Sequence, residues 1–212
     1  MTDPFHEGER AVQSLAGVTE MAARIGNSIH HTIPDASRVF LAQQRLIFLA
    51  AADERGGLWA GALAGEPGFA VAEDEHVVRL SSSIRAGDAL EGRIIPGRAV
   101  GLLAIEFATR RRMRLNGTVR DVGEGVFRIV AHEVFGNCPK YIQRRELPAG
   151  KPPSPVRPEA SRATSLSPSQ EEWIAAADTF LIATAHPDAG ADVSHRGGNP
   201  GFVRVLDQRT LL

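Results

Sequence analysis

The chain has 212 residues, of which 43% are hydrophobic, enough for a packed core in one large or two small domains. Its net charge of -1 excludes a global attraction to nucleic acid or to anionic membranes, and we expect neither partner. The single cysteine, Cys138, excludes an internal disulfide framework, and the polar N-terminal segment lacks a secretory signal. No apolar run approaches the length of a membrane-spanning helix. We therefore expect a soluble, cytoplasmic protein.

Helices are the first predicted elements. Apolar residues at mixed helical spacings between Phe5 and Ile25 predict one or two short helices, interrupted at Gly17. Asp35 is expected to cap a further helix formed by the segment ASRVFLAQQR that follows it.

Strands are predicted for most of the next hundred residues. The apolar runs LIFLAAA (46–52) and LWAGAL (58–63) should pair around the turn-like segment DERGG (53–57). Five further strand segments, separated by Gly-containing turns, are GFAVA, HVVRLSS, AVGLLAIEF, RMRLNGTVRDV and GVFRIVAHEVF. Few helices lie between them, so the pattern predicts an α+β fold that is mainly β, with an antiparallel sheet closing into a barrel.

The composition divides the chain into three parts. Residues 1–146 form the predicted barrel domain with its leading helices, Pro-rich residues 147–166 an extended surface linker, and residues 167–212 a second unit. In this second unit Ser167 should cap the helix PSQEEWIAAAD, with Pro168 at its first position, before the apolar run TFLIATA.

The two units share an ordered pattern of helix cap, helix, apolar run, turn and Pro-Gly-Phe. Aligned on this pattern, FLAAADERGGLWAGALAGEPGFAV lies beside FLIATAHPDAGADVSHRGGNPGFVRV, which matches Phe48 with Phe180. The order predicts an internal duplication. The second unit stops soon after its Pro-Gly-Phe, so we expect either a fragment of a longer chain or terminal strands that join the first barrel or a partner subunit.

Polar residues distinguish the second unit from the first. Where the first has Trp59-Ala60-Gly61-Ala62-Leu63, the second has Asp192-Val193-Ser194-His195-Arg196. On a strand, Asp192, Ser194 and Arg196 would share one face suited to an anionic or polar ligand. The alternative is a solvated edge strand on which Asp192 pairs with Arg196.

Two more segments could contact an anion. The loop LSSSIRAGD, residues 80–88, offers three hydroxyls and Arg85 to a phosphate, or it is an ordinary turn. On a predicted strand, Arg110, Arg112 and Arg114 point one way. Burying three like charges is prohibitive, so their face should meet solvent, an acidic partner surface or an anionic ligand.

The segment after the last predicted strand of the barrel combines several reactive residue types. Lys140 and Tyr141 follow a Cys-Pro turn, which presents an amine and a phenol at a defined place. Cys138 has no evident base beside it and is expected to be a small buried residue rather than a nucleophile. The seven histidines fit no metal-ligand spacing, and no metal site is predicted.

Several segments together resemble the pyridoxamine 5'-phosphate oxidase-like flavoproteins, in particular the bacterial branch with a duplicated FMN-binding split barrel. The resemblance covers nearly the whole chain through FHEGERAVQ, AGEPGF, RRRMRLNGTV, FGNCPKYIQ and DVSHRGGNPGFVRV. It implies a six-stranded antiparallel split barrel, followed here by the start of a second copy, and an FMN site shared between two barrels. It also implies a homodimer and suggests a ferredoxin-like electron-transfer partner.

The resemblance implies particular cofactor contacts in the first unit. Ser83 and Arg85 match the family's phosphate-loop elements, and Arg112 holds the sheet position that faces the flavin. Ala86 stands where the oxidases proper carry a lysine, and their arginine-rich C-terminal end has no counterpart here. Both departures argue against pyridoxamine phosphate oxidation itself.

Further contacts are implied near the junction of the units. Lys140 and Tyr141 belong to the branch's Cys-Pro-Lys-Tyr signature, and Ser194, His195 and Arg196 lie where the second barrel lines the cofactor. The resemblance thus implies an FMN-binding oxidoreductase of unknown substrate. The alternatives are a cofactor-free interaction or scaffold module, or a split barrel that binds haem or a deazaflavin.

Overall fold

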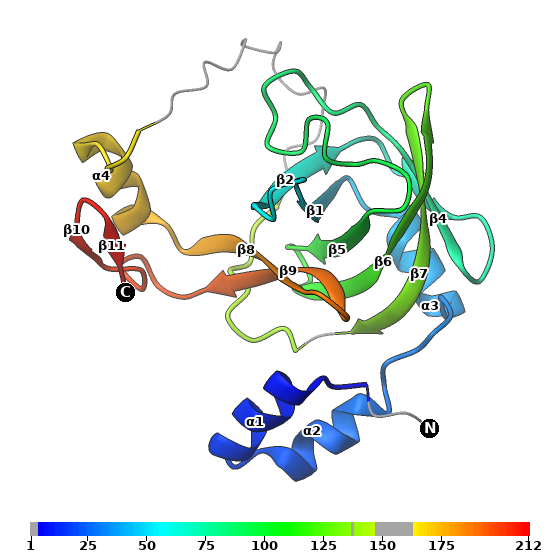
Figure 1. The fold of residues 1–212 in the computed structure, drawn as a ribbon, viewed down its shortest axis with the longest axis horizontal. Coiled ribbons are helices and arrows are strands. Elements are labelled where there is room, and N and C mark those ends of the chain that lie inside the picture. Colours follow the sequence, from blue (N-terminus) through cyan, green and yellow to red (C-terminus); the bar gives the residue numbers. More distant parts are fainter. Residues whose placement is uncertain (1–3, 137, 147–162) are drawn as a thin grey trace.

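Seven strands between residues 46 and 136 form one curled antiparallel sheet in the computed structural model, which describes residues 4–136, 138–146 and 163–212 (Figure 1). The strands of this sheet are β1 (Leu46–Ala52), β2 (Leu58–Ala64), β3 (Ala70–Ala72), β4 (Val77–Ser81), β5 (Ala99–Glu106), β6 (Arg111–Gly123) and β7 (Val126–Gly136). Their order is β2-β1-β5-β6-β7-β4-β3. The α+β class and the predicted strand segments are confirmed. The implied count of six is wrong for this sheet, because the short strand β3 also pairs with β4.

Four helices accompany the sheet in the part of the chain that the structure describes. They are α1 (Glu7–Leu15), α2 (Thr19–Gly26), α3 (Asp35–Ala42) and α4 (Pro168–Ala176). Ser167 caps α4 as predicted, and Pro168 stands in its first turn. Asp35, in contrast, is the first residue of α3 rather than its cap. The cap position is taken by Pro34, which offers no side-chain acceptor.

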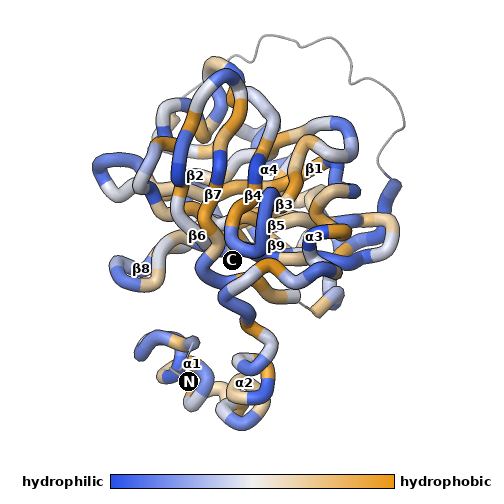
Figure 2. Tube along the Cα trace, turned by 90° about the vertical axis from the view of Figure 1, so that its right-hand side faces the viewer, coloured by the Kyte–Doolittle hydropathy of each residue, from blue (hydrophilic) through white to orange (hydrophobic). Residues whose placement is uncertain are grey.

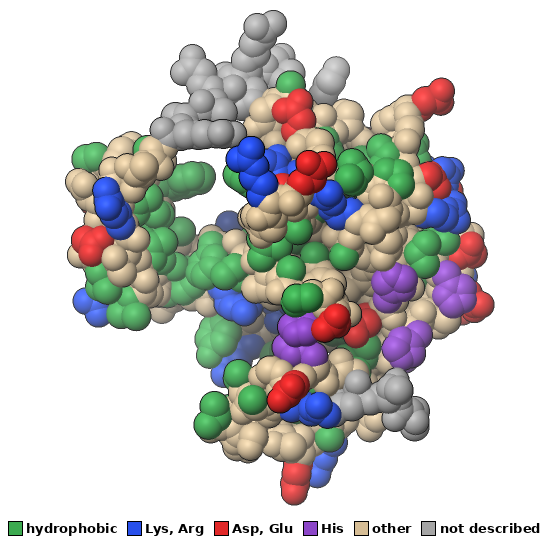
Figure 3. Space-filling view, viewed as in Figure 1, with side chains coloured by type: hydrophobic (Ala, Val, Ile, Leu, Met, Phe, Trp, Pro, Cys, Tyr) green, Lys and Arg blue, Asp and Glu red, His purple; other side chains and the backbone are tan. Residues whose placement is uncertain are grey.

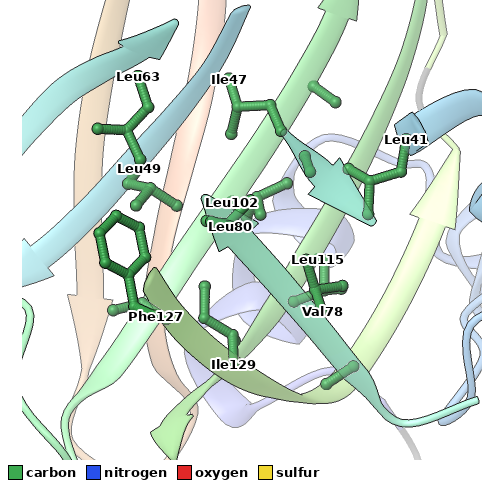
Figure 4. Packing of buried hydrophobic residues seen from close by; sticks show 14 of the residues in the cluster. Leu41, Ile47, Leu49, Leu63, Val78, Leu80, Leu102, Leu115, Phe127 and Ile129 are labelled. Carbon is green, nitrogen blue, oxygen red and sulfur yellow. The ribbon is translucent and has the colours of Figure 1, made fainter. Parts of the chain in front are cut away.

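The concave side of the sheet holds the main core. Side chains from α3 and from β1, β2, β4, β5, β6 and β7 meet there, among them Leu41, Leu49 and Leu102, which are fully buried (Figure 4). In Figure 2 the hydrophobic stretches gather in this body, while the α1–α2 pair lies apart from it. On β6, Met113 and Leu115 point into the core, so the alternating residues Arg112 and Arg114 point to the outer face.

A second hairpin covers part of that outer face. Its strands are β8 (Thr179–His186) and β9 (Gly190–Gly197), followed by β10 (Val205–Asp207) and β11 (Thr210–Leu211). Val193 of β9 packs with Ala50 of β1 and with Leu103 and Ile105 of β5 in a smaller buried cluster. The approach is closest at Gly101, where an added Cβ would lie 2.6 Å from the Asp192 Cα. The second unit is therefore docked on the first sheet through apolar contacts. Most of the predicted linker, 147–162, lies outside the described residues.

The β1–β2 and β8–β9 hairpins close in the same way. Leu46 pairs with Ala64, and Thr179 pairs with Gly197. The two closing partners are therefore separated by the same number of residues in both hairpins. The residue after each hairpin is a glycine whose amide donates to the carbonyl of the residue before the hairpin, over 3.1 Å in the first and 3.0 Å in the second.

The two Pro-Gly-Phe segments form the same turn. In both Glu66–Phe69 and Asn199–Phe202 the last amide donates to the first carbonyl, over 2.9 Å and 3.0 Å. The glycines, Gly68 and Gly201, have φ of +93° and +86°. Proline at the second position and a positive-φ glycine at the third define a type II turn. The two units thus match in backbone geometry as well as in sequence order.

Candidate functional site

Five of the eight predicted site residues line one cleft of about 790 Å³. These residues are Arg112, Lys140, Tyr141, His195 and Arg196. They come from β6, from the segment after β7 and from the end of β9, which lie far apart in the sequence. Docking of the second hairpin on the first sheet brings them together.

The other walls of the cleft are apolar. Phe180 of β8 and Phe202 of the second type II turn stack with their ring centroids 5.7 Å apart and their planes at 16°. The remaining apolar wall residues are Ile174, Ala177, Val203, Leu211 and Leu212. Hydrophobic side chains also gather on the surface of the lobe formed by α4 and the β10–β11 hairpin (Figure 3). The cleft therefore combines cationic groups on one side with an aromatic and aliphatic wall on the other.

The three arginines predicted to share a face have different surroundings. Arg110 precedes β6 with a φ of +59°, in a turn, so it does not continue the alternation of Arg112 and Arg114. Arg112 reaches the cleft, where its Nε is buried and has no hydrogen-bond partner in the described chain. Burial, followed by the nearby charge of Arg114, lowers the pKa of Arg112. A negatively charged ligand would offset both costs.

Arg114 instead binds the second hairpin. Its Nη2 donates to the Ser194 hydroxyl over 2.8 Å, and that hydroxyl donates to Asp192 Oδ2 over 3.2 Å. The Arg114 Nε also lies 3.1 Å from Asp192 Oδ1, without the alignment of a hydrogen bond. Ser194 is 6% exposed and takes part in this docking contact rather than lining the cleft. The alternative pair of Asp192 with Arg196 is not formed, since Asp192 is paired with Arg114.

His195 is the most deeply buried polar residue of the cleft. It is 4% exposed, and its Nε2 has no hydrogen-bond partner in the described chain. Burial, followed by the charges of Arg112 and Arg196, lowers the pKa of His195 to about 4. The imidazole is therefore neutral near pH 7, so it adds a polar contact to the cleft without adding a charge.

The lowered pKa of His195 makes folding depend on pH. Between pH 6.5 and about 4 the unfolded chain binds a proton that the folded protein does not, so this contribution to stability is full at pH 7 and falls as the pH drops. We expect His195 to cost about 2 kcal/mol of unfolding free energy by pH 5. Urea unfolding at pH 7 and pH 5 should give a smaller pH-dependent loss in His195→Gln than in the wild type. Equal losses would contradict this assignment, and exposed His76→Gln is the control.

The segment after β7 is fixed against the second hairpin. An added Cβ on Gly197 would lie 2.2 Å from the Tyr141 carbonyl oxygen, so only glycine allows this approach. Gln143 donates to the Gly198 carbonyl over 2.9 Å, and Arg145 binds Asp178 over 2.6 Å. Tyr141 has a φ of +69°, and its ring lies 5.0 Å from the Lys140 ammonium. These contacts hold Lys140 and Tyr141 at the mouth of the cleft.

Three residues singled out in the sequence lie elsewhere. Ser83 and Arg85 are exposed on the loop after β4, and neither lines this cleft. Cys138 is exposed as well, so the expectation of a buried cysteine is wrong. It directly precedes Pro139 and lies outside the strands of the sheet.

The described residues give no sign of a metal centre or a membrane span. In 4–136, 138–146 and 163–212, no group of three or more His, Cys, Asp and Glu side chains could hold a metal ion. Among the helices described, none has the length and hydropathy needed to cross a bilayer.

Among known proteins, the three solved structures named below are similar to about half of this chain. No family model and no curated protein matches the chain. Similar solved structures include a HupZ variant from Group A Streptococcus, which is 13% identical, covers 50% of this chain and 99% of its own, and has a TM-score of 0.39. HutZ, the heme storage protein from Vibrio cholerae, is 14% identical over 49% and 94% of the two chains, with a TM-score of 0.32. An F420 reductase is 16% identical over 50% and 97%, with a TM-score of 0.31.

Proposed function

We propose that the cleft binds FMN and that the protein is an FMN-dependent oxidoreductase related to the pyridoxamine 5'-phosphate oxidases. One observation carries the proposal. Residues from three separate segments, each matched by sequence to cofactor contacts of that family, line a single cleft. Its volume of about 790 Å³ lies within the range of small-molecule sites.

The chemistry of the cleft fits such a cofactor. The stacked rings of Phe180 and Phe202 offer an apolar surface to a planar ring system. The buried Nε of Arg112 and Nε2 of His195 have no partner in the described chain and suit the polar edge of a heteroaromatic ring. Lys140 and Arg196 add positive charge at the same walls.

The protein residues would bind and orient the cofactor. FMN supplies hydride or electron transfer when bound. Arg112 and Lys140 would stabilise negative charge on the reduced ring, because electrostatic interactions with fixed cations are stronger where water is partly excluded. His195 would contact the ring as a neutral group. Ser194 would act indirectly, through Arg114, by holding β9 against the sheet.

The proposal includes the architecture implied by the resemblance. We infer a split barrel in residues 1–146, a linker in 147–166 and a second, duplicated unit in 167–212. The matching hairpin closures and type II turns support the duplication. A cytoplasmic homodimer with an unknown small-molecule substrate and a ferredoxin-like electron-transfer partner completes the proposal.

FMN binding can be tested on the purified chain with single substitutions. Arg196→Ala and Lys140→Ala each remove one cation from the cleft, so each should lower FMN affinity about tenfold in a fluorescence titration. Arg24→Ala, an exposed arginine of α2, should leave the affinity unchanged. A colourless protein that neither retains nor takes up FMN would contradict the proposed function.

A cofactor-free interaction module is the second candidate. It is favoured by exposed apolar side chains on the second unit, which include Trp173 at 79%, Leu206 at 52% and Ile182 at 40% exposure. Light scattering with and without FMN separates the two functions. In a scaffold, the protein alone would fix the mass, and FMN would change neither the mass nor the melting temperature.

A further inference from the structure

We propose that a hollow between the start of α3 and the start of β6 is an anion site, and that the phosphate of the cofactor binds there rather than at Ser83 and Arg85. The second half of this statement rests on the proposed function, whereas the first half does not. The hollow has a volume of about 330 Å³ and is lined by Ser37, Thr109, Arg110, Arg111 and Arg112, among others. Arg112 also lines the main cleft, so the two spaces adjoin at this residue.

The charges around the hollow leave two cations uncompensated. Arg111 is neutralised by Glu106, whose carboxylate lies 2.8 Å from its Nη2 and also accepts from the Thr109 hydroxyl. None of the ion pairs in the described part of the chain includes Arg110 or Arg112. No carboxylate is among the residues that line the hollow. A phosphate-sized anion would therefore meet two free guanidinium groups, which bind phosphate oxygens strongly.

The first turn of α3 adds neutral donors. Among the described residues no side chain caps this helix, and its first amide groups have no partner within the helix. Ser37 makes no side-chain hydrogen bond in the described chain and is among the residues that line the same hollow. Asp35 is the one carboxylate of α3. Its side chain is fully exposed and lies 4.0 Å from Arg38.

The loop after β4, unlike the hollow, has no residue among those that line the cleft. Neither Ser83 nor Arg85 lines the cleft or the hollow. Arg112 lines both the cleft and the Arg110–Arg112 hollow, so a cofactor whose ring occupies the cleft would extend past this one side chain to place its phosphate in the hollow. The predicted arginine cluster is thus divided between docking, through Arg114, and anion binding, through Arg110 and Arg112.

The anion site can be tested without the cofactor, by titrating ¹⁵N-labelled protein with inorganic phosphate. We expect saturable amide shifts at Ser37 and at residues 109–112, and their loss in Arg110→Asn, since asparagine tolerates the positive φ and removes the charge. Ser37→Glu, which places a carboxylate in the hollow, should also abolish the shifts. Shifts confined to residues 82–86, or none at residues 109–112, would overturn the anion site.

Riboflavin and FMN then test the second half of the proposal. Arg110→Asn should weaken FMN about tenfold and leave riboflavin unchanged, because riboflavin lacks the phosphate. Arg85→Asn should weaken neither. Loss of FMN preference in Arg85→Asn alone would place the phosphate at the β4 loop and overturn this assignment. Phosphate binding at residues 109–112 without binding of either flavin would leave the anion site standing and reject the proposed function.

Discussion

Replacing Gly101 with alanine should displace the β8–β9 hairpin from the sheet and destroy the cleft. Gly101 is the third residue of β5, and an added Cβ there would be 2.6 Å from the Asp192 Cα and 2.8 Å from the Val193 amide nitrogen. Both atoms belong to the backbone, so no rotamer change can relieve the contact. Moving β9 away would expose Val193 and separate Arg114 from Asp192. We expect a loss of about 3 kcal/mol in unfolding free energy.

The measurement combines urea unfolding with FMN titration of Gly101→Ala. Stability and FMN affinity should fall together, because the cleft contains residues of both the sheet and the hairpin. Gly123→Ala is the matched control, since Gly123 is also a strand glycine and an added Cβ there meets nothing within 4 Å. A stable Gly101→Ala protein with wild-type affinity would mean that the hairpin does not dock where the structure has it.

Much of the fold could be predicted from local patterns. LIFLAAA forms β1 at the predicted residues, because a central strand with side chains buried on both faces must be continuously apolar. Ser167 and Pro168 start α4 as predicted, since a cap and a first-turn proline act within one turn. The local pattern predicted the start of α3 one residue too late. Asp35 was expected to cap the helix, but Pro34 occupies the cap position and Asp35 is the first helical residue.

Aligning the two units by residue type alone places the first strand of the second unit one residue out of register. The sequence match placed Phe48 opposite Phe180, whereas counting from the closing pairs of the hairpins places Phe48 opposite Leu181. The difference matters because a shift of one residue moves a strand side chain to the other face. Leu181 packs in the smaller buried cluster beside Phe48, and Phe180 lines the cleft. Two adjacent apolar residues satisfy either alignment, so composition could not choose between them.

The candidate site was predicted in part, for a physical reason. Residue type alone identified His195 and Arg196 as polar replacements for apolar residues of the first unit. It did not indicate that Ser194 would bind Arg114, since the two residues are 80 positions apart in the sequence. Nor did it indicate that His195 would be 4% exposed, because burial depends on how β9 docks. Phe180 and Phe202 carried no signal of a binding role, as isolated aromatic residues are ordinary core residues.

Replacing Asp192 with alanine should be the most damaging polar substitution in the second unit. The Arg114 side chain is 15% exposed and that of Asp192 is 23% exposed, so most of this contact is shielded from water. Without the carboxylate, a largely buried guanidinium would keep its hydrogen bond to Ser194 and its contact with the Phe135 ring but would lose its anionic partner. Burial already lowers the pKa of Arg114, and the charge of Asp192 acts in the opposite direction. We expect a loss of about 3 kcal/mol, measured by urea unfolding.

A double substitution separates the ion pair from simple packing. If the cost of Asp192→Ala comes from the unpaired charge, Asp192→Leu combined with Arg114→Met should restore most of the stability, because two apolar side chains need no partner. Asp188→Ala, an exposed carboxylate in the turn of the same hairpin, should change stability by less than about 0.5 kcal/mol. If the double variant is as unstable as Asp192→Ala, the hairpin is held by the shape of its contacts. If it is stable, the cost of Asp192→Ala comes from leaving the Arg114 guanidinium largely buried without its carboxylate partner.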